Sequence, residues 1–594
     1  MRVLVFNAGS SSLKFGLFDG DRQVFKGSFD RFREGGCDLA FEGADGPPEQ
    51  GRAPHADLAA AIAAVPGVLA ERGLAGIDAV GHRLAHGGTE FTGPAKIDEA
   101  VIARIEALTP LAPLHNPAML EGLRLASRIW PDVPQVAVFD TSFHLTNPAR
   151  ATTYAVPAAW RDAGLRRFGF HGTSHKYVAQ RAAEALGQPL SDLRIISVHL
   201  GNGASACAVQ YGASIDSSMG MTPLEGLVMG TRSGDIDPGA FGFLQRHLRL
   251  DVAAIEAALY SDSGLKGLTG SPDMRDVEDR AAAGDAAAQL AINLYAYRVR
   301  KYLGGYAAAM GGVDAVVFTG GIGQNSASMR RRICDGLSFM GLMLDDDRNR
   351  APDLSDRAAP QIQAQGSRVA VVVTETAEQL MIAREVRGLL DRPALTPQPV
   401  PVAVSGRHVH LSAETVRALF GADYRLTEGA PLRQPGNWVA EERVTLEGPK
   451  GRLERVAILG PLRPRTQIEV SRTDSFALGI DAPVRNSGQL EGTPKVRLIG
   501  PQGAVETDGL IVAARHVHTN PTDAAAMGLT DGEMVEIEVQ GADGRGLVFA
   551  HTLVRVAVGT VTEMHIDTDE ANAAGISGHV EGAVVPHVQA LPKG

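Results

Sequence analysis

The tetrapeptide Arg-His-Val-His occurs twice in the last third of the sequence, as Arg407–His410 and as Arg515–His518. Each copy follows a short apolar run of the kind that forms a β-strand. Because residues two apart on a strand point to the same face, each copy presents two imidazoles side by side, an arrangement that can hold a divalent metal ion. One such pair could be a chance alternation on a surface strand. Two identical pairs, each preceded by arginine, favour a metal site.

A second group of candidate residues lies in the first 390 residues, where glycines and hydroxyl side chains follow apolar, strand-like runs. The three junctions are Asn7–Lys14, His199–Gly203 and Thr319–Asn325. Backbone N–H groups and hydroxyls in such turns can bind phosphate oxygens, and Lys14 adds a positive charge. A single serine-rich turn is usually only a turn, but three junctions of this kind indicate a phosphate or nucleotide site.

The elements expected to position these two groups differ in kind. Front-part strand candidates are Val3–Phe6, Gln135–Phe139, Arg194–His199 and Ala315–Phe318, and they alternate with helix candidates at Asp57–Arg72, Lys176–Ala185, Asp285–Tyr306 and Ala377–Leu390. This alternation predicts an α/β fold. Back-part runs at Arg452–Leu459, Gln467–Val470, Met534–Val539 and Leu547–Val556 predict small β-barrels or sandwiches with few helices. The repeated tetrapeptide could mark a duplicated barrel, and the proline-rich residues 391–400 predict an extended linker between the two parts.

Size and composition narrow the class of protein. A chain of 594 residues is too long for one hydrophobic core. A net charge of −11 lacks the basic bias of nucleic-acid-binding proteins, and no apolar run is long enough to span a membrane. The three cysteines have no paired spacing, which argues against disulfides and against a cysteine-ligated zinc. A strand candidate at the start leaves no room for a signal peptide. We therefore expect a cytoplasmic enzyme that acts on small molecules and binds neither nucleic acid nor membrane.

Six long motifs occur in order in the front part, at residues 6–14, 81–88, 139–144, 168–175, 216–223 and 230–235. With these motifs, residues 1–390 resemble the acetate kinases of the acetokinase family. The resemblance implies an actin-like, sugar-kinase-like (ASKHA) fold with two α/β domains, residues 1–150 and 151–390, that close around a nucleotide cleft. The final helix could pack back on the first domain. We also expect a homodimer or higher homo-oligomer.

The resemblance implies roles for individual residues of the kinase part. Arg83 and Arg232 would clamp the carboxyl phosphate, His171 would stabilise charge in the transition state, and Asp140 would position the reacting groups. Two matched positions near Mg²⁺ are Asn7 and Glu378. Matched nucleotide positions are Lys14, His199, Leu200, Gly201, Asn202, Gly203, Asp273, Met274, Arg275, Gly320, Gly321, Ile322, Gly323 and Gln324.

Other matched positions concern the acyl group and the remaining histidines. Residues matching the acyl pocket are Ala85, Leu114, Phe170 and Pro223. The family commonly has valine where Ala85 stands, so a smaller wall could admit propionate beside acetate. It also commonly has glutamate where Gln324 stands, a loss expected to tune nucleotide affinity. Histidines expected to be structural are His82, His86, His115, His144 and His175.

Residues 401–594 resemble the PduL-type phosphotransacylases, also called phosphate propanoyltransferases. The motifs that carry this resemblance lie at residues 404–411, 460–463, 467–469, 482–485, 515–518 and 564–572. The resemblance implies two zinc ions, one held by His408, His410 and Glu469 and the other by His516, His518 and His565. It matches Arg463 to a catalytic, phosphate-binding arginine and Asn572 to a residue beside the site. Gly406 stands where the family commonly has an asparagine near coenzyme A. The acidic run 567–570 could be a calcium loop, but the beginning of a helix is the better interpretation.

Together the two resemblances imply a bifunctional enzyme that links acetyl-CoA to acetate through acetyl phosphate. The transferase would use phosphate and a coenzyme A thioester with Zn²⁺, and the kinase would use ADP and ATP with Mg²⁺. The back part would consist of two β subdomains. An acyl kinase-transferase that prefers propionate or butyrate is one alternative. A second is an acetate kinase whose C-terminal part is a non-catalytic binding module, although six matched ligand positions argue against a silent module.

Overall fold

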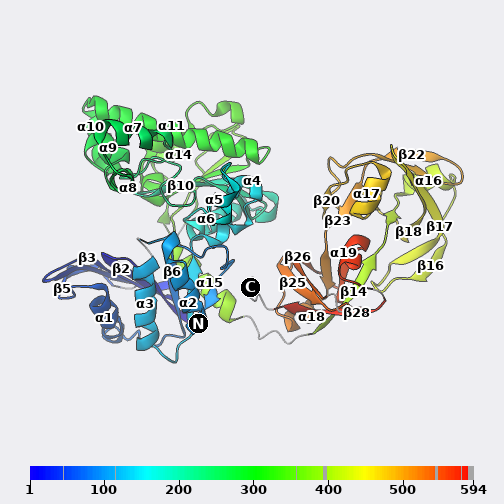
Figure 1. Cartoon of the computed structure of the whole chain (residues 1–594), viewed down its shortest axis with the longest axis horizontal. Helices are drawn as coiled ribbons and strands as arrows, with labels where there is room; N and C mark the ends of the chain where they lie inside the picture. Colours follow the sequence, from blue (N-terminus) through cyan, green and yellow to red (C-terminus); the bar gives the residue numbers. More distant parts are fainter. Residues whose placement is uncertain are drawn as a thin grey trace. The chain divides into compact units, whose positions relative to one another are not determined.

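The computed structural model describes residues 1–44, 46–113, 116–355, 358–391, 398–541, 546–576 and 578–585. The chain divides into two compact units, Met1–Asp391 and Arg392–Gly594. Figure 1 shows a first unit built of strands and helices and a second built mainly of strands. Most of the expected linker, residues 392–397, lies outside the described residues. None of the described helices is long and apolar enough to cross a membrane.

The first unit begins with an eight-stranded sheet in the order β5-β4-β3-β2-β1-β6-β8-β7. Its strands are β1 Arg2–Ala8, β2 Ser12–Asp19, β3 Arg22–Arg33, β4 Gly36–Gly43, β5 Glu49–Ala53, β6 Ala79–Leu84, β7 Ala95–Lys96 and β8 Gln135–Phe139. The hairpins β1–β5 pair antiparallel, whereas β6 and β8 continue from β1 in parallel. Helices α1 (Leu58–Ala70) and α3 (Asn116–Ile129) cover one face over a phenylalanine-rich core.

The second sheet repeats this arrangement in the order β11-β10-β9-β12-β13. The antiparallel strands are β9 Arg194–Leu200, β10 Ala204–Gln210 and β11 Ala213–Ser217, and the parallel additions are β12 Ala315–Thr319 and β13 Ala370–Val373. Helices α10 (Met274–Ala282) and α11 (Ala286–Ala309) pack on one face. Two similar sheets, each with a hairpin followed by parallel strands, confirm the predicted actin-like class.

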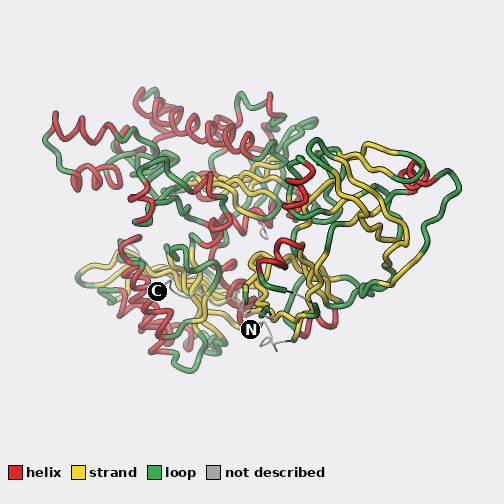
Figure 2. Tube along the Cα trace, turned by 45° about the vertical axis from the view of Figure 1, so that its right-hand side comes forward, coloured by secondary structure: helices red, strands yellow, loops and turns green. Residues whose placement is uncertain are grey.

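Helices α6 (Gly172–Leu186) and α15 (Glu378–Leu390) share a core with side chains from both sheets. Although α15 ends the unit, it packs on the first sheet: a Cβ at Gly81 would lie within 2.9 Å of Ile382 and 2.8 Å of Val386. The absence of a side chain at Gly81 therefore permits this close packing. In Figure 2 the helices of the first unit flank its strands, in contrast with the strand-dominated second unit.

The second unit contains two β-structures with separate cores. A closed barrel has the order β14-β27-β24-β26-β25-β28, and a nine-stranded sheet has the order β20-β23-β19-β15-β18-β17-β21-β22 with β16 beside β17. The strands are β14 Pro399–Ser405, β15 His408–His410, β16 Glu428–Pro431, β17 Trp438–Glu447, β18 Arg452–Gly460, β19 Gln467–Glu469, β20 Val484–Arg485, β21 Val496–Ile499, β22 Ala504–Thr507, β23 Leu510–Ala513, β24 His516–Thr519, β25 Met534–Val539, β26 Leu547–Val556, β27 Glu563–Asp567 and β28 Val580–Val585. The predicted mainly β architecture is confirmed, but only one of the two described β-structures closes into a barrel.

The duplication suggested by the tetrapeptide extends far beyond it. In each half, the histidine strand (β15 or β24) has an antiparallel neighbour (β19 or β27) and a parallel neighbour (β18 or β26). Helices follow at corresponding points: α16 Ala413–Phe420 and α18 Pro521–Ala526 after the histidine strands, α17 Arg472–Leu478 and α19 Thr568–Ala573 after the neighbours. Of these four helices, only the beginning of α19 was predicted, from its acidic run, because six to eight residues are too few to show a helical period.

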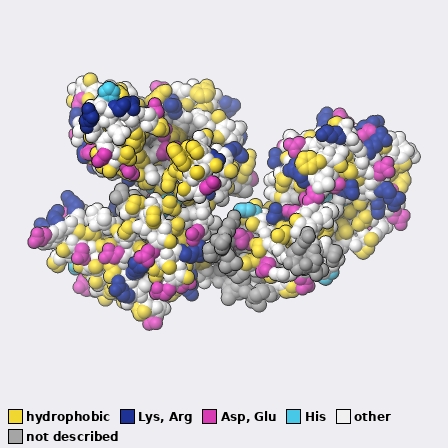
Figure 3. Space-filling view, in the orientation of Figure 1, with side chains coloured by type: hydrophobic (Ala, Val, Ile, Leu, Met, Phe, Trp, Pro, Cys, Tyr) yellow, Lys and Arg dark blue, Asp and Glu magenta, His cyan; other side chains and the backbone are white. Residues whose placement is uncertain are grey.

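Basic and acidic side chains are interspersed over the described surface of both units on the face shown in Figure 3. The three cysteines, Cys37, Cys207 and Cys334, are free, and all three are buried.

Candidate active sites

The first candidate site lies where β1, β6 and β8 end beside one another. Nε of Arg83 donates to Oδ2 of Asp140 at 3.1 Å, and its Nη1 donates to Oδ1 of Asn7 at 3.2 Å. The parallel register of β6 and β8 places Arg83 near the end that leads to Asp140, which is 2% exposed. Burial raises the pKa of Asp140, and the ion pair with Arg83 opposes that rise by stabilising the carboxylate. Three predicted residues are thus in direct contact.

His171 lies next to this cluster, because the N–H of the following residue, Gly172, donates to the carbonyl of Asp140 at 2.9 Å. The residue caps α6 in a left-handed conformation, with φ of 57°, which is uncommon for histidine and typical of functional sites. A Cβ at Gly203 would lie 3.7 Å from Nε2 of His171 and 3.8 Å from Nη1 of Arg232. The glycine therefore leaves open space between a histidine and an arginine that the sequence predicted to act together.

A chain of hydrogen bonds holds the His171 ring from behind. Nδ1 of His171 lies 2.9 Å from Oγ of Ser205, which lies 2.8 Å from Nε2 of His175, whose Nδ1 lies 2.7 Å from Oγ of Ser197. Burial, the largest cause, and nearby charged groups lower the pKa of both histidines well below its usual value, so both rings are neutral. This chain gives His175 a specific structural role, and Ser205 is a contact that sequence motifs did not indicate.

Apart from Lys14, the predicted nucleotide residues come from three segments of the second half of the first unit. Residues 199–203 form the end of β9 and the turn into β10, and residues 320–324 lie against them: a Cβ at Gly320, where φ is 77°, would lie 2.6 Å from the carbonyl oxygen of Leu200. The segment 320–324 was expected to be a loop, but it forms α12 (Gly320–Asn325) directly after β12. Arg330, which is 1% exposed, donates to the carbonyls of Gly323 at 2.8 Å and Gln324 at 2.7 Å and so fixes this helix.

The third nucleotide segment starts α10. Asp273 caps that helix by accepting from the N–H of Arg275 at 2.9 Å, and their side chains also pair at 2.6 Å. The Met274 side chain is buried in the hydrophobic core, so only its backbone is available to a ligand. Leu200 is likewise buried.

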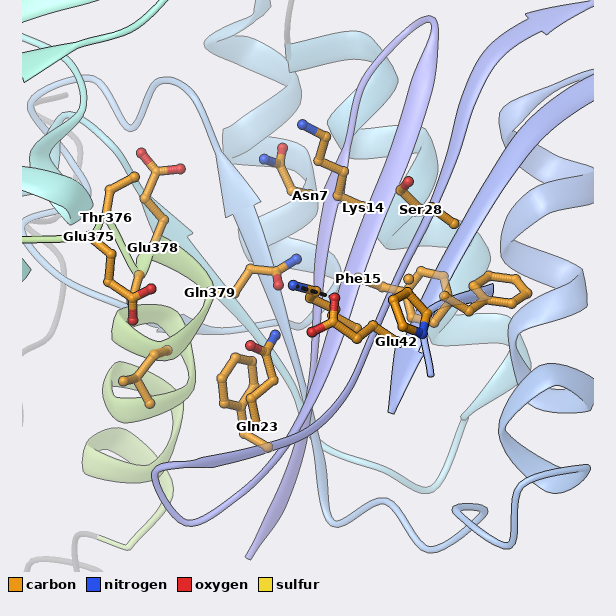
Figure 4. A pocket seen from close by; sticks show the side chains of 18 of the residues that line it. Asn7, Lys14, Phe15, Gln23, Ser28, Glu42, Glu375, Thr376, Glu378 and Gln379 are labelled. Carbon is orange, nitrogen blue, oxygen red and sulfur yellow. Dashed lines mark ion pairs between the residues drawn. The ribbon is translucent and has the colours of Figure 1, made fainter. Parts of the chain in front are cut away.

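A cavity of about 500 Å³ opens beside β2 and the start of α15. Figure 4 shows Asn7, Lys14, Glu378 and Gln379 around it. Lys14 lies directly opposite Asn7 in the hairpin register, because Gly9–Ser12 forms a tight turn with a 2.8 Å backbone hydrogen bond. The serine-rich segment is therefore a hairpin turn between two strands, and Asn7 and Lys14 of this hairpin line the same cavity as Glu378 of α15.

Residues expected around the acyl group are partly assembled. Ala85 and Phe170 are each 4% exposed, and the ring centroids of His86 and Phe170 are 5.7 Å apart. The carbonyl of Pro223 accepts from Nη1 of Arg232 at 3.2 Å, which connects this region to the arginine. Leu114, and the expected structural residue His115, lie outside the described residues.

The other histidines expected to be structural are buried. His82 pairs with Gln135 at 2.7 Å, and His144 contacts Ser214 at 2.9 Å and the carbonyl of Phe170 at 3.0 Å. Burial lowers the pKa of His82, His86 and His144 to about 4 in each case, so these rings are neutral at pH 7.

The second candidate site contains two groups of side chains that could hold a metal ion. Ligand atoms of His408, His410 and Glu469 lie within 4.8 Å of one another, and so do those of His516, His518 and His565. Each group combines a His-X-His strand with a residue directly opposite on the antiparallel neighbour, since the register pairs His408 with Glu469 and His516 with His565.

The hydrogen bonds of these histidines suit a metal ion. Nδ1 of His408 lies 2.8 Å from the carbonyl of Gly406, and Nδ1 of His516 lies 2.9 Å from that of Ala514. Such a bond fixes the proton on Nδ1 and leaves the Nε2 lone pair for a metal. Burial lowers the pKa of His410 and His516 to about 3, so no proton competes for the ligand nitrogen at neutral pH. The residues therefore fit divalent ions such as zinc.

Both groups line one cavity of about 570 Å³, together with the arginines Arg407, Arg433, Arg463 and Arg555. Arg463 contacts Oγ of Ser487 at 3.3 Å, and that hydroxyl donates to Glu469 at 3.1 Å. Arg555, which motifs did not indicate, lies directly opposite His518 on β26. Gly406 also lines the cavity, whereas Asn572 is exposed on α19 and is not among its described lining residues.

The acidic run 567–570 begins α19 through a capping box between Asp567 and Glu570. The prediction that this run begins a helix is therefore confirmed.

Comparisons with known proteins agree with the division of the chain into two compact units. Residues 2–384 match the acetokinase family, and residues 401–577 match the phosphate propanoyltransferases. An acetate kinase of Clavibacter michiganensis subsp. michiganensis is 50% identical over 390 residues, covering 64% of this chain and 98% of that protein. An acetate kinase of Carboxydothermus hydrogenoformans is 46% identical over 394 residues, covering 65% and 98%.

Solved structures resemble the first unit. Porphyromonas gingivalis acetate kinase gives a TM-score of 0.62 at 41% identity, covering 66% of this chain and 99% of that one. A propionate kinase from Francisella tularensis gives 0.61 at 40% identity, covering 65% and 98%. The family match spans more than half of the sequence and contains the cluster of Asn7, Arg83 and Asp140. The chain belongs to the acetokinase family and carries, behind its kinase, a module of the phosphate propanoyltransferase family.

Proposed function

We propose that this enzyme interconverts acetyl-CoA and acetate through acetyl phosphate. The observation that carries the proposal is that one chain contains an arginine–histidine cluster suited to a carboxyl phosphate and a cavity with two sets of metal-binding side chains. Acetyl phosphate is the product of one reaction and the substrate of the other. In the direction of ATP formation, phosphate displaces coenzyme A from acetyl-CoA, and the phosphoryl group then passes to ADP.

In the kinase, the chain's own residues bind and orient the reacting groups. Arg232 and Arg83 bind the phosphoryl and carboxyl oxygens, and Nε2–H of His171 donates to charge that develops on the transferred group. Asp140 holds Arg83 in position through their ion pair. Bound Mg²⁺, for which Asn7 and Glu378 offer oxygen ligands, would neutralise phosphate charge.

In the transferase, two arginines bind phosphate and the histidine strands organise the thioester. Arg463 and Arg555 line the same cavity and supply positive charge for phosphate, whose oxygen attacks the acyl carbon while the thiolate of coenzyme A leaves. Two Zn²⁺ ions would polarise the thioester and lower the pKa of the leaving thiol. The full sets of ligands argue against a silent binding module.

The acyl preference is a finer part of the proposal. Ala85 is smaller than valine, which favours acceptance of propionate beside acetate. The propionate kinase similarity fits that alternative only loosely, because an acetate kinase is equally similar. A cytoplasmic location and a homo-oligomer also remain proposals, the former supported by three free, buried cysteines.

Purified full-length protein supplied with acetyl-CoA, phosphate, ADP and Mg²⁺ tests the proposal. We expect ATP and free coenzyme A to form in equal amounts, and ATP formation to stop when phosphate or ADP is omitted. Release of coenzyme A without ATP would refute the coupled reaction. ATP formation from acetyl phosphate and ADP, but not from acetyl-CoA, phosphate and ADP, would indicate that the C-terminal module is silent. Propionyl-CoA and butyryl-CoA in the same assay give the acyl preference.

The hydrogen-bond chain behind His171 makes a separate prediction. A serine hydroxyl has one proton. If Ser205 donates that proton to Nδ1 of His171, the neutral ring carries its own proton on Nε2, on the side of the ring near Gly203. We expect Ser205→Ala to lower the kinase kcat about tenfold, or ~1.4 kcal/mol, with little change in the KM for acetate. Steady-state kinetics measure both.

The control is Ser197→Ala, which removes a hydroxyl one step further along the same chain. Its loss of kcat should be smaller. Equal losses in the two variants, or a change confined to KM, would contradict a role for Ser205 in orienting the proton of His171.

A further inference from the structure

The two halves of the second unit correspond residue for residue around their ligands. Arg407 pairs with Asp474 at 3.0 Å, and Arg515 pairs with Glu570 at 2.8 Å. Both acids occupy the same position of a capping box, at the start of α17 and α19. The two histidine strands are therefore anchored in the same way, and any difference between the corresponding metal sites is local.

One such difference concerns the residue two positions before the third ligand. On β19 this residue is Gln467, whose amide donates to the carboxylate of Glu469. On β27 it is Glu563, whose Oε2 lies 3.0 Å from Nε2 of His565. Residues two apart on a strand share a face, so the two members of each pair lie on one face of their strand, and Glu469, Glu563 and His565 line the cavity. An amide and a carboxylate in one half thus correspond to a carboxylate and an imidazole in the other.

Glu563 is unusually well held for a carboxylate with no assigned role. It is 7% exposed and stands directly opposite His518 in the strand register. Nε2 of Gln434 donates to it at 3.4 Å, and Nε of Arg433 lies 3.8 Å away. Burying a carboxylate is costly even when hydrogen bonds and opposite charges offset part of the desolvation penalty, so the presence of a charge at this position requires an explanation.

Charge supplies the explanation. Both groups of ligands line one cavity, so two divalent ions there would repel each other. The first group contains one negative charge, on Glu469, whereas the three histidines of the second group contain none. With Glu563 included, each site has one carboxylate. In the first site it is the third ligand, Glu469, and in the second it is Glu563, two residues before the third ligand.

We propose that Glu563 is a functional part of the second metal site. Its carboxylate accepts the Nε2–H of His565, which leaves the Nδ1 lone pair of that ring for a divalent cation, and it supplies the negative charge that Glu469 supplies at the first site. This inference rests on the proposed function, because it requires that the transferase binds two ions. Glu563 is a positioning residue, since it acts through His565.

The test measures metal binding by the purified full-length protein, with zinc alone as the probe. Zinc per chain is determined after dialysis against a series of chelator-buffered zinc concentrations. We expect two zinc ions per chain in the unaltered protein. Glu563→Gln keeps the shape but removes the charge, and it should weaken one of the two sites about 10- to 100-fold while the other stays unchanged.

A variant with only the second site assigns the effect. In a His408→Ala background, Glu563→Gln should weaken the remaining ion by the same factor, and in a His516→Ala background it should have no effect. Glu538→Gln, which removes an exposed carboxylate from β25 of the same barrel, is the matched control and should bind zinc normally. Thermal unfolding followed by circular dichroism reports that the second unit of each variant is folded, because kinase activity depends only on the separate first unit.

Glu563→Asp, with a shorter side chain that retains the charge, should bind zinc with intermediate affinity, and it carries the test if Glu563→Gln does not fold. If the unaltered protein binds two zinc ions and both Glu563 variants bind them with the same affinity as the unaltered protein, the inference is overturned and the transferase assignment stays intact. Failure of the unaltered protein to bind zinc would refute the metal sites themselves.

Discussion

Replacing Arg232 with alanine is expected to lower the kinase kcat about 1,000-fold, equivalent to ~4 kcal/mol of transition-state stabilisation. Arg232 is half-buried, and burial lowers its pKa. Among the described residues it has no carboxylate ion pair; its Nη1 instead bonds to the carbonyl of Pro223. A partly desolvated cation without an anionic partner is poised to bind an anionic substrate, and its removal leaves the transferring phosphoryl group without that charge.

Arg232 is a better test of the phosphoryl clamp than Arg83. Arg83 already pairs with buried Asp140, so Arg83→Ala would leave an uncompensated carboxylate and combine loss of catalysis with loss of stability. Arg232→Ala unpairs no acid among the residues that the structure describes. The rate of acetyl phosphate formation from ATP and acetate measures the effect.

Two controls accompany this prediction. Arg246→Ala removes an exposed arginine from α7 (Gly239–Leu248) and should leave the rate unchanged. Arg232→Lys keeps the charge but loses the two-pronged geometry of guanidinium, so an intermediate rate is expected. Near-normal turnover by Arg232→Ala would remove this residue from the site, and coenzyme A release by the transferase should be normal in all three variants.

Replacing His516 or His410 with alanine is expected to abolish acyl transfer while kinase activity is retained. Each substitution removes one of three protein ligands, and the remaining two cannot hold a divalent ion tightly at the concentrations present in an assay. The kinase should be unaffected because its residues belong to a separate compact unit. Coenzyme A release with acetyl-CoA and phosphate, kinase rate and zinc content are measured on the same preparations.

His579→Ala is the matched control, because His579 is exposed in the same module and belongs to neither ligand group. It should keep both activities and its zinc. Normal acyl transfer by a His516→Ala protein that has lost zinc would show that the reaction does not need the second ion. Simultaneous loss of both activities would contradict the independence of the two units.

Much of the fold follows from local sequence patterns. The strands Gln135–Phe139, Met534–Val539 and Leu547–Val556 have the bounds expected from their apolar runs. The helix expected at 285–306 begins where Asp285 caps α11 by accepting from two backbone N–H groups. Such features depend on neighbouring residues, so they can be predicted without knowledge of the tertiary structure. The four short helices of the second unit have too few residues to give a periodic signal.

In the candidate metal sites, too, some features follow from local sequence patterns and others only from the tertiary structure. Strand periodicity alone indicated the pairs His408/His410 and His516/His518, because spacing by two is a local property. Periodicity could not indicate which residue completes each group. Strand register places Glu469 opposite His408 and His565 opposite His516, and register is set by the packing of distant segments. Only the resemblance to known families connected these residues from sequence.

The residues that no motif indicated are those whose partners are distant in the sequence. Ser205 is an ordinary buried serine until the fold places it between His171 and His175, and Arg555 is one of many arginines until its strand pairs with that of His518. Glu563 differs from an unremarkable strand glutamate only through burial beside His565 and Gln434. The sequence by itself determined which residue types could do chemistry and which strands carry them. The tertiary structure decided which of them meet, because burial, charge pairing and strand register depend on contacts between segments far apart in the chain.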